Sequence, residues 1–527
     1  MESATQPDAP AAPADDAAGN GAPQATETID VHRPVDGSVL ETIAVDSPER
    51  VREVVARVRA AQPEWEAMGF EGRKRWLDAL RDWILDHQDE LDDRMQEESG
   101  KVRADAALEA FYLLEALNFW SERGPRWLAD EIVPAHMPLL RTRRAKITYR
   151  PFPVAGVVSP WNFPLILSLG DGIPALVAGS ALVIKPSEFT PLTLMELARA
   201  WKEDLGAPDV FDVVNGTGET GGALVDECDF IQFTGSERTG KVVMKRAADT
   251  LTPVSLELGG KDPMIVTRDA DVDRAANAAC FGGFLNTGQI CLSIERVYVE
   301  EPIYDEFVAK LKANAEKLRQ GADGRSYSAE VGAMTSPNQL DIVSDHVEDA
   351  RQAGARILTG GKRKDQAGDW YEPTVIADAD HSMKVMREET FGPVVPVMKV
   401  ADVDDAVRLA NDTAYGLGGA VFAGDTDDGE RIARRLEAGT VSVNDLFMTN
   451  YSFLGLPMGG WKSSGIGYRH GPAGIRKFCR SESLTVPRLP QPKREFLWFP
   501  YSPRQRSVVR RLYRFFNARG LRNRLGL

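Results

Sequence analysis

The chain has 527 residues, of which 43% are hydrophobic and 27% are charged, and its formal net charge is −15. This length exceeds what one hydrophobic core normally organises, so two or three domains are expected. The acidic balance argues against nonspecific nucleic-acid binding by the body of the chain. The four cysteines and six histidines show neither CxxC nor HxxxH spacing. We therefore predict no metal site, no disulfide framework and a cytoplasmic location.

The first part of the chain changes character twice before any strand–helix alternation begins. Residues 1–27 contain no Lys or Arg and are rich in Ala and Pro, which predicts a disordered leader without a signal peptide. From Ser47 to about Leu117, apolar residues recur three and four positions apart, which predicts helices. Residues 139–151 alternate and are strongly basic, which predicts an exposed β-ribbon suited to subunit contact.

Beyond Val154, short apolar runs alternate with helical patterns, such as 190–205, in two successive regions. This alternation predicts parallel sheets covered on both faces, and hence two α/β domains with a ligand cleft near their junction. Prolines and glycines inside the apolar stretch 154–184 argue against a membrane span. The expected strands are 154–159, 181–184, 210–215, 230–233, 264–266, 296–299, 355–358, 394–398 and 439–444.

The C-terminal segment, residues 491–527, differs from everything before it. From Lys493 onward it carries ten basic residues against one acid, Glu495, a net charge of +9. Apolar residues such as Val508 and Leu512 fall on one face of a predicted helix that follows an aromatic stretch. A basic amphipathic helix of this kind either lies on anionic lipid or packs on a neighbouring subunit or over the substrate entrance.

One thiol stands in a chemically distinctive setting. Cys291 ends the segment NTGQIC, whose small residues allow another molecule to approach closely, whereas Cys228, Cys280 and Cys479 are interpreted as structural. Thirty-four residues upstream, Glu257 is a lone carboxylate in the apolar, glycine-rich segment LELGG. A nucleophile with a base nearby is what covalent catalysis requires, and burial would tune the carboxylate for that task. The alternative interpretations are that Cys291 is a small apolar residue that fills space in the core, and that Glu257 is a solvent-exposed residue of an edge strand.

Four further segments end predicted strands and carry polar groups. Asn162 is flanked by prolines in SPWNFP, and it is either a rigid hydrogen-bond donor to an oxyanion or a turn residue. The segment NGTGETG from Asn215 fits GxGxxG, a dinucleotide fingerprint. FTGS at 233–236 offers backbone N–H groups to a phosphate, and KPSE at 185–188 offers a cation and an anion for ribose hydroxyls. Each of these glycine-containing or charged segments is otherwise an ordinary strand-to-helix turn.

Taken together, these segments resemble the aldehyde dehydrogenase superfamily over about residues 30–487. The motifs that carry the resemblance stand in the family's order: SPWNFP at 159–164, KPSE at 185–188, FTGS at 233–236, LELGGK at 256–261, NTGQIC at 286–291, EETFGPV at 388–394 and PMGGWKSSGIG at 457–467. The resemblance implies an α/β fold with two doubly wound parallel-sheet domains, one for the cofactor and one catalytic, plus a β-ribbon for oligomerisation.

The implied organisation also assigns bounds. The dinucleotide-binding domain would comprise 28–138 and 152–257, and the catalytic domain 258–477. The oligomerisation ribbon would comprise 139–151 and 478–490, before the basic tail at 491–527. The implied partners are a small-molecule aldehyde and further copies of the chain, as a homodimer or homotetramer, with no nucleic acid and with membrane contact only through the tail.

The resemblance further implies roles. Cys291 would be the nucleophile and Glu257 the general base, while Asn162 and the backbone N–H of Cys291 would form the oxyanion hole. The implied cofactor-binding residues are Trp161, Lys185, Glu188, Gly216, Gly235, Ser236, Leu258, Glu389 and Phe391. Within this set the pyrophosphate meets Gly235 and Ser236, which leaves Gly216 as a turn near the adenine.

The implied reaction is NAD(P)-dependent oxidation of an aldehyde to its acid, through a thiohemiacetal and a thioester on the cysteine. Family members that pass the acyl group to coenzyme A tend to lack the glutamate, so its presence favours hydrolysis. Because the Glu188 carboxylate can accept both ribose hydroxyls and repels a 2′-phosphate, NAD is expected over NADP.

The chain departs from the family's pattern at sites that bear on mechanism and substrate. Family members often carry Glu where Arg469 stands and Lys where Asp171 stands, so we hypothesise an Asp171–Arg469 pair. Enzymes for succinate semialdehyde often hold the substrate carboxylate with arginines, where this chain has Gly170 and Leu285. A medium-chain or aromatic aldehyde is therefore favoured. Two alternatives remain. One is succinate-semialdehyde dehydrogenase, because the segment SIER at 293–296 resembles a long-tailed bacterial branch that includes such enzymes. The other is a membrane-associated fatty aldehyde dehydrogenase.

Overall fold

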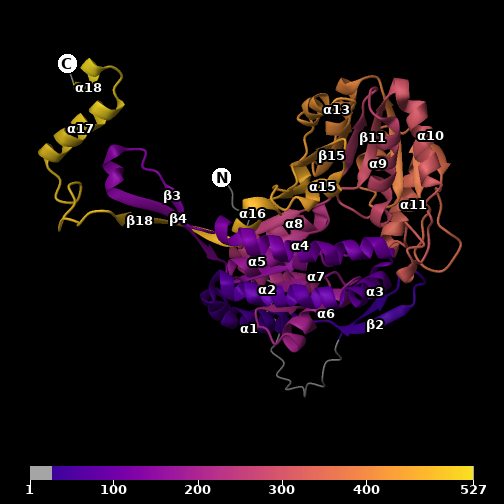
Figure 1. Cartoon of the computed structure of the whole chain (residues 1–527), viewed down its shortest axis with the longest axis horizontal. Helices are drawn as coiled ribbons and strands as arrows, with labels where there is room; N and C mark the ends of the chain where they lie inside the picture. Colours follow the sequence, from indigo (N-terminus) through magenta and orange to yellow (C-terminus); the bar gives the residue numbers. More distant parts are fainter. Residues whose placement is uncertain (1–26, 526–527) are drawn as a thin grey trace, which may run out of the picture.

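The computed structural model describes residues 27–525, so the leader expected at 1–27 lies almost entirely outside the described residues. Two sheets dominate the molecule, and a narrow ribbon extends from the body toward the C-terminus (Figure 1). Before the first sheet, the chain forms the hairpin β1 (Thr28–His32) and β2 (Val39–Ala44). It continues through the helices α1 (Pro48–Ala67), α2 (Gly69–Asp86), α3 (Gln88–Ser99) and α4 (Arg103–Trp127).

The six-stranded sheet has the order β17-β9-β8-β5-β6-β7, and all its neighbours are parallel except β17 and β9. Its strands are β5 (Val154–Val158), β6 (Ala181–Lys185), β7 (Phe211–Val213), β8 (Phe230–Thr234), β9 (Val254–Glu257) and β17 (Gly465–Ile466). The helices around it are α5 (Leu169–Ala178), α6 (Leu192–Arg199), α7 (Gly218–Glu227), α8 (Glu237–Thr250) and α16 (Gly471–Arg476). The helix expected at 190–205 therefore ends as an α-helix at Arg199, and a π-helical turn follows over Ala200–Asp204.

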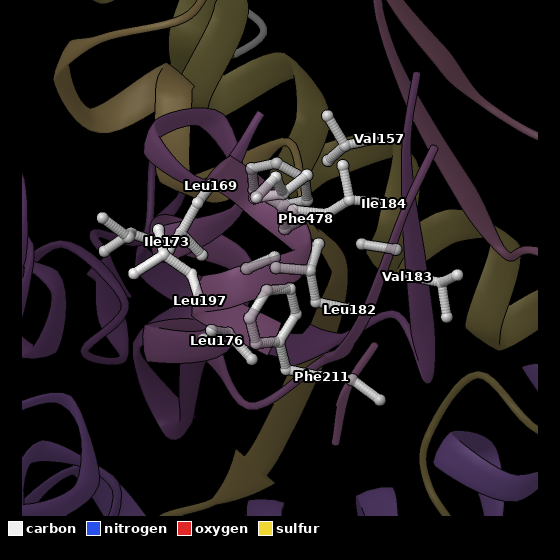
Figure 2. Close-up of a cluster of buried hydrophobic side chains, with 14 of the residues drawn as sticks. Val157, Leu169, Ile173, Leu176, Leu182, Val183, Ile184, Leu197, Phe211 and Phe478 are labelled. Atoms are coloured by element: carbon white, nitrogen blue, oxygen red, sulfur yellow. The ribbon is translucent and has the colours of Figure 1, made fainter. Parts of the chain in front are cut away.

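Close packing of β6 against α5 anchors this sheet. Leu182 and Ile184 of β6 meet Leu169, Ile173 and Leu176 of α5 in a fully apolar cluster (Figure 2). A methyl group at Gly172 would lie 2.4 Å from a Leu182 carbon, so glycine is what lets the helix approach the strand. Because strand side chains alternate, Val183 points to the opposite face, and α1 also packs against β6.

The seven-stranded sheet has the order β12-β13-β14-β11-β10-β15-β16 and is parallel except for the edge strand β12. Its strands are β10 (Asp262–Val266), β11 (Ile294–Glu300), β12 (Arg356–Thr359), β13 (Thr374–Ala377), β14 (Val394–Val400), β15 (Gly418–Phe422) and β16 (Thr440–Val443). Its helices are α9 (Val272–Phe284), α10 (Tyr304–Ala315), α11 (Pro337–Gln352), α12 (Lys384–Arg387), α13 (Val403–Asn411), α14 (Thr426–Ala433) and α15 (Phe447–Ser452).

Both faces of this second sheet are buried, as the predicted α/β fold requires. Met264 and Val266 of β10 enter one apolar cluster, whereas Ile265 between them enters another. Two of the strands, β13 and β15, are absent from the sequence-based expectation. β15 begins with two glycines, which weaken its strand signal. Both strands are held in the sheet by parallel pairing, β13 with β14 and β15 with β10 and β16.

The ribbon is three-stranded, in the order β18-β4-β3, with β3 (Glu131–Val133), β4 (Arg143–Pro151) and β18 (Cys479–Pro487). The prediction that the strand occupies all of 139–151 is wrong at its start, because Pro138–Thr142 forms a 3₁₀ turn. Proline favours the first position of a helical turn, where its missing N–H is not needed. Beyond the ribbon, α17 (Pro503–Asn517) and α18 (Leu521–Leu525) lie away from the body (Figure 1). No helix within 27–525 has both the length and the apolar character to cross a bilayer.

Candidate active site

The carboxyl edge of the six-stranded sheet gathers most of the predicted residues. The chain passes from β5 outward to β6 and β7, and then returns to the other side of β5 with β8 and β9. Ligands in parallel α/β sheets bind at such a reversal point, outside the carboxyl ends of the strands. The segments that leave β5 and β8 here contain Trp161 and Asn162 on one side and Gly235 and Ser236 on the other.

A cavity of about 690 Å³ opens at this edge, and we call it the cofactor-side cavity. Of the predicted residues, its walls include Trp161, Asn162, Gly235, Ser236, Leu258, Cys291, Glu389 and Phe391. Four others, Lys185, Glu188, Gly216 and Glu257, stand outside these walls. The Lys185 ammonium lies 3.5 Å from a Glu188 carboxylate oxygen at the end of β6, and Gly216 precedes α7.

The start of α8 supplies the cavity with backbone N–H groups. Ser236 is the N-cap residue, and its hydroxyl accepts a hydrogen bond from the Thr239 N–H at 3.3 Å. The first N–H groups of a helix have no partner within the helix and carry a partial positive charge, so they favour a phosphate. This geometry suits the FTGS segment to bind an anionic group.

Glu389 and Phe391 are positioned by another carboxylate, Glu295. The backbone N–H groups of Thr390 and Phe391 donate to Glu295 at 2.8 and 2.7 Å, and the Lys261 ammonium lies 2.6 Å from the same carboxylate. Glu389 in turn accepts from the Gly260 N–H at 2.9 Å. Burial, with Glu295 adding to it, raises the pKa of Glu389 to about 8.

The Phe391 ring packs edge-on against Trp161, with the ring centroids 5.4 Å apart. A methyl group on Gly259 would lie 2.4 Å from a Glu389 oxygen, so the bare backbone there makes room for that carboxylate. The wall of the cofactor-side cavity between Gly259 and Phe391 is therefore built by contacts between different sequence motifs.

The segment before Cys291 has an unusual backbone. Asn286 and Thr287 have positive φ angles of 51° and 57°, and Gly288 follows at 72°. Each such non-glycine residue costs about 1–3 kcal/mol, so surrounding contacts must stabilise the loop. The buried Lys101 ammonium supplies one of them, because it donates to the Asn286 side-chain oxygen at 2.9 Å and also to the Asn162 carbonyl.

Asn162 is buried and faces this loop. Its side-chain N–H donates to the Gln289 carbonyl at 2.9 Å, which uses one of the two hydrogens on that nitrogen. The second hydrogen remains as a donor on the wall that Asn162 shares with Cys291. The arrangement can therefore stabilise negative charge that develops beside the thiol.

Glu257 lies at the end of β9, buried, and contacts the Arg469 guanidinium. Burial raises the pKa of Glu257, and Arg469 opposes that rise. Burial raises the pKa of the Cys291 thiol as well, and the charge of Glu257 adds to this effect. Cys291 is partly exposed where the two cavities reach it.

A second cavity, of about 500 Å³, reaches Cys291 from another direction, and we call it the apolar cavity. Its walls are largely aromatic and aliphatic, and they include Phe111, Phe119, Phe163, Ile290, Phe447, Met448 and Phe453. Among the described residues on its wall, Glu115 is the one that carries a charge. Gly170 and Leu285, where an arginine was sought, are both buried outside this wall.

Buried charges that no sequence motif indicates brace the site. Lys101 pairs with Glu109 at 3.3 Å, and Asp105 accepts from the Asn286 N–H at 3.0 Å. One signal was available, since Asp105 and Glu109 stand four residues apart in an alanine-rich helix. Their partners lie far away in sequence, so the pattern alone does not identify them. Within residues 27–525, no cluster of His, Cys, Asp or Glu side chains is arranged to hold a metal ion.

The fold agrees with comparisons to known proteins. Residues 22–484 match the model of the aldehyde dehydrogenase family, and the chain belongs to that family. A protein of Mycobacterium ulcerans (strain Agy99), named "Putative succinate-semialdehyde dehydrogenase [NADP(+)] 2", is 40% identical over 467 residues, which is 88% of this chain and 89% of that protein.

Two further proteins illustrate the range of the family. The 4,4'-diapolycopene aldehyde oxidase of Methylomonas sp is 40% identical over 478 residues, which is 90% of this chain and 88% of the relative. The solved structure of "Putative Aldehyde Dehydrogenase PutA" from Anabaena variabilis has a TM-score of 0.85 and 38% identity, and the match covers 90% of this chain and all of that one.

The strained loop makes a first prediction. Gly288→Ala forces a side chain into a left-handed position and places Cβ 2.1 Å from the Gly392 carbonyl oxygen. We expect a loss of more than about 1 kcal/mol of stability and a changed rate of Cys291 alkylation by iodoacetamide, because the loop must move. Thermal unfolding and mass spectrometry measure both. Gly321→Ala is the matched control, since its Cβ meets nothing within 4 Å, and equal behaviour of the two variants would contradict the prediction.

Proposed function

We propose that this aldehyde dehydrogenase oxidises an apolar aldehyde to its carboxylic acid through a covalent intermediate on Cys291, with NAD as the preferred acceptor. The observation that carries the proposal is that Cys291 lies on the walls of both cavities. A thiol in that place can hold a substrate that enters from the apolar side while a cofactor lies on the other side.

The residues present fit a dinucleotide. The N-terminus of α8 would meet the pyrophosphate at Gly235 and Ser236, and Glu389 and Phe391 would flank the nicotinamide half. Lys185 and Glu188 would hold the adenosine ribose beyond the cavity wall. Bound there, the nicotinamide would take up the two electrons that leave the substrate carbon.

The protein's own groups account for the remaining chemistry. The Cys291 thiol gives its proton to water in the cavities that reach it, and its sulfur attacks the aldehyde carbon while the Asn162 side-chain N–H stabilises the resulting oxyanion. After oxidation the acyl group is a thioester on Cys291. Glu257 then removes a proton from water, which attacks the thioester and releases the acid and the thiol.

The choice of substrate follows from the apolar cavity. Its wall carries no Lys or Arg among the described residues, and Glu115 would repel a second carboxylate. An unpaired carboxylate is costly to bury, so succinate semialdehyde fits poorly. The Mycobacterium relative's name favours that substrate, whereas the Methylomonas relative's name favours a long apolar one. The wall chemistry supports the second.

The choice of cofactor follows from Glu188. Its carboxylate is partly exposed next to Lys185, where it can accept hydrogen bonds from both ribose hydroxyls. A 2′-phosphate would meet the same negative charge, which supports NAD as the cofactor, although the Mycobacterium relative is named for NADP. Lys185 offsets this repulsion only in part, because it already pairs with Glu188.

A substitution at the base tests the covalent route. Glu257→Gln keeps the size of the side chain but cannot accept a proton, so we expect one rapid turnover of NAD reduction and then an acyl group retained on Cys291. Stopped-flow absorbance and intact-protein mass spectrometry measure these, and steady-state turnover should fall about 10²- to 10⁴-fold. Cys291→Ala should show neither signal. A full burst with unchanged turnover in Glu257→Gln would exclude this role.

A panel of aldehydes tests the substrate class. We expect kcat/KM to rise about fourfold with each methylene from butanal to octanal, because each buried CH₂ contributes about 0.8 kcal/mol. Succinate semialdehyde should be a poor substrate, and NAD should outperform NADP throughout the panel. A preference for succinate semialdehyde over hexanal would overturn the substrate proposal and leave the covalent route untouched.

We further propose that the chain works in the cytoplasm as a homodimer or homotetramer joined through the ribbon, with the basic tail against an anionic membrane. The ribbon leaves Ile132 and Leu484 exposed at its surface, as a subunit contact would. All four cysteines are free, which supports a reducing compartment. α17 buries none of its residues, and its exposed apolar side chains include Leu512 and Phe516.

Vesicle binding tests the tail. Full-length protein should co-sediment with phosphatidylserine-containing vesicles and not with phosphatidylcholine alone, because arginines beside an apolar helix face are attracted to anionic lipid. The full-length double variant Arg510→Glu/Arg511→Glu and the protein shortened to 1–492 should both lose binding. Light scattering should give the same number of subunits for each. Equal sedimentation of all three proteins would exclude the membrane role, and a single-chain mass would exclude the subunit contact.

A further inference from the structure

A buried arginine stands behind the predicted base. The Arg469 guanidinium donates to both carboxylate oxygens of Asp171, at 2.6 and 2.9 Å, and its remaining terminal nitrogen contacts a Glu257 oxygen. It also donates to the Thr234 hydroxyl at 2.8 Å. Arg469 and Asp171 are each less than 5% exposed, so the three charges interact with little solvent screening.

The fold fixes this arrangement from three directions. Glu257 ends β9, and its partner across the antiparallel pair is Gly465 of β17, so the loop that leaves β17 carries Arg469 back toward the base. The Arg469 N–H donates to the Met458 carbonyl at 2.7 Å, which holds that loop. Asp171 lies in the first turn of α5, where the helix N-terminus favours a negative charge.

Arg469 interacts with Glu257 as well as with its partner Asp171. Asp171 occupies two guanidinium nitrogens, and the third remains directed at Glu257. Lys477, which follows α16, also influences Glu257, and burial lowers the pKa of that lysine to about 8. The other ionisable groups nearby are the phenols of Tyr112 and Tyr451, the His470 imidazole and the Cys291 thiol. Arg469 is thus the cation in contact with the base.

We propose that Arg469, anchored by Asp171, is a positioning residue that keeps Glu257 ionised and fixed in direction, so that it can take a proton from the water that hydrolyses the thioester. This inference rests on the function proposed above. Arginine suits the task because its planar group can hold one carboxylate with two bonds and still present a third nitrogen to another. A lysine in its place would have a single nitrogen for both carboxylates.

The expected pH dependence has a definite sign. Glu257 acts as a base only in its carboxylate form, and burial raises its pKa while Arg469 opposes the rise. Activity is therefore present above the pKa of Glu257 and is lost as the pH falls through it. Removing the Arg469 charge raises that pKa further, whereas neutralising Asp171 removes a charge that raises it.

The experiment measures the rate at which the acyl group leaves Cys291 as a function of pH, with hexanal and NAD, by quenching and intact-protein mass spectrometry. Arg469→Gln should shift the acid limb of this profile upward by about one to three pH units. Arg469→Lys keeps the charge and should hold the limb near its original position. Asp171→Asn should shift the limb downward.

The opposite shifts separate this role from a structural one, because a loss of folding alone lowers the rate without moving the limb. If Arg469→Gln does not fold, as judged by near-ultraviolet circular dichroism, Asp171→Asn still tests the sign. An unmoved limb in folded Arg469→Gln, or an upward shift in Asp171→Asn, would overturn the inference. Absence of any acyl group on Cys291 in the unaltered protein would instead refute the proposed function.

Discussion

The buried ammonium of Lys101 connects the parts of the molecule on which the site depends. It enters from the segment between the N-terminal helices α3 and α4, and it donates both to the Asn162 carbonyl and to the Asn286 side chain. The first belongs to the turn after β5 and the second to the strained loop before Cys291. Because this one group binds both segments, it fixes the Asn162 side chain and the Cys291 thiol relative to each other across two domains. Glu109 balances the charge at 3.3 Å.

The same principle recurs twice around the cavity. Lys261 and Glu295 hold the loop of Glu389 and Phe391, and Arg469 and Asp171 stand behind Glu257. Buried ion pairs contribute little net stability, since removing two charges from water costs about as much as their attraction returns. Their value here is geometric. Each pair fixes a backbone segment that has an irregular conformation. Because water is excluded there, the side chains keep their orientation.

The two cavities differ in character, and Cys291 lies where both end. On the cofactor side the wall is polar, and the N-terminus of α8 at Ser236 favours a phosphate there. On the other side the wall is aromatic and aliphatic, with Glu115 as its charge among the described residues. A thiol between these surroundings is desolvated, and this burial raises the pKa of Cys291. Glu257 ends β9 outside both walls, and there it contacts Arg469.

The sequence by itself determined the local chemistry of this protein. Strand-ending motifs such as SPWNFP and FTGS, the thiol of Cys291 and the carboxylate of Glu257 are all visible within a few neighbouring residues, because turns and strand ends are set by short-range backbone preferences. The alternation of apolar runs likewise predicted two α/β units, although it did not predict β13 or β15, the latter beginning with two glycines. Only the tertiary structure decided which groups meet. Lys101 and Asn286 lie 185 positions apart and Asp171 and Arg469 lie 298 apart, and no local pattern encodes contacts at that range. The apolar cavity is likewise assembled from α4, the turn after β5 and the segment around α15, so its lack of a cation is a property of the folded wall and not of any motif.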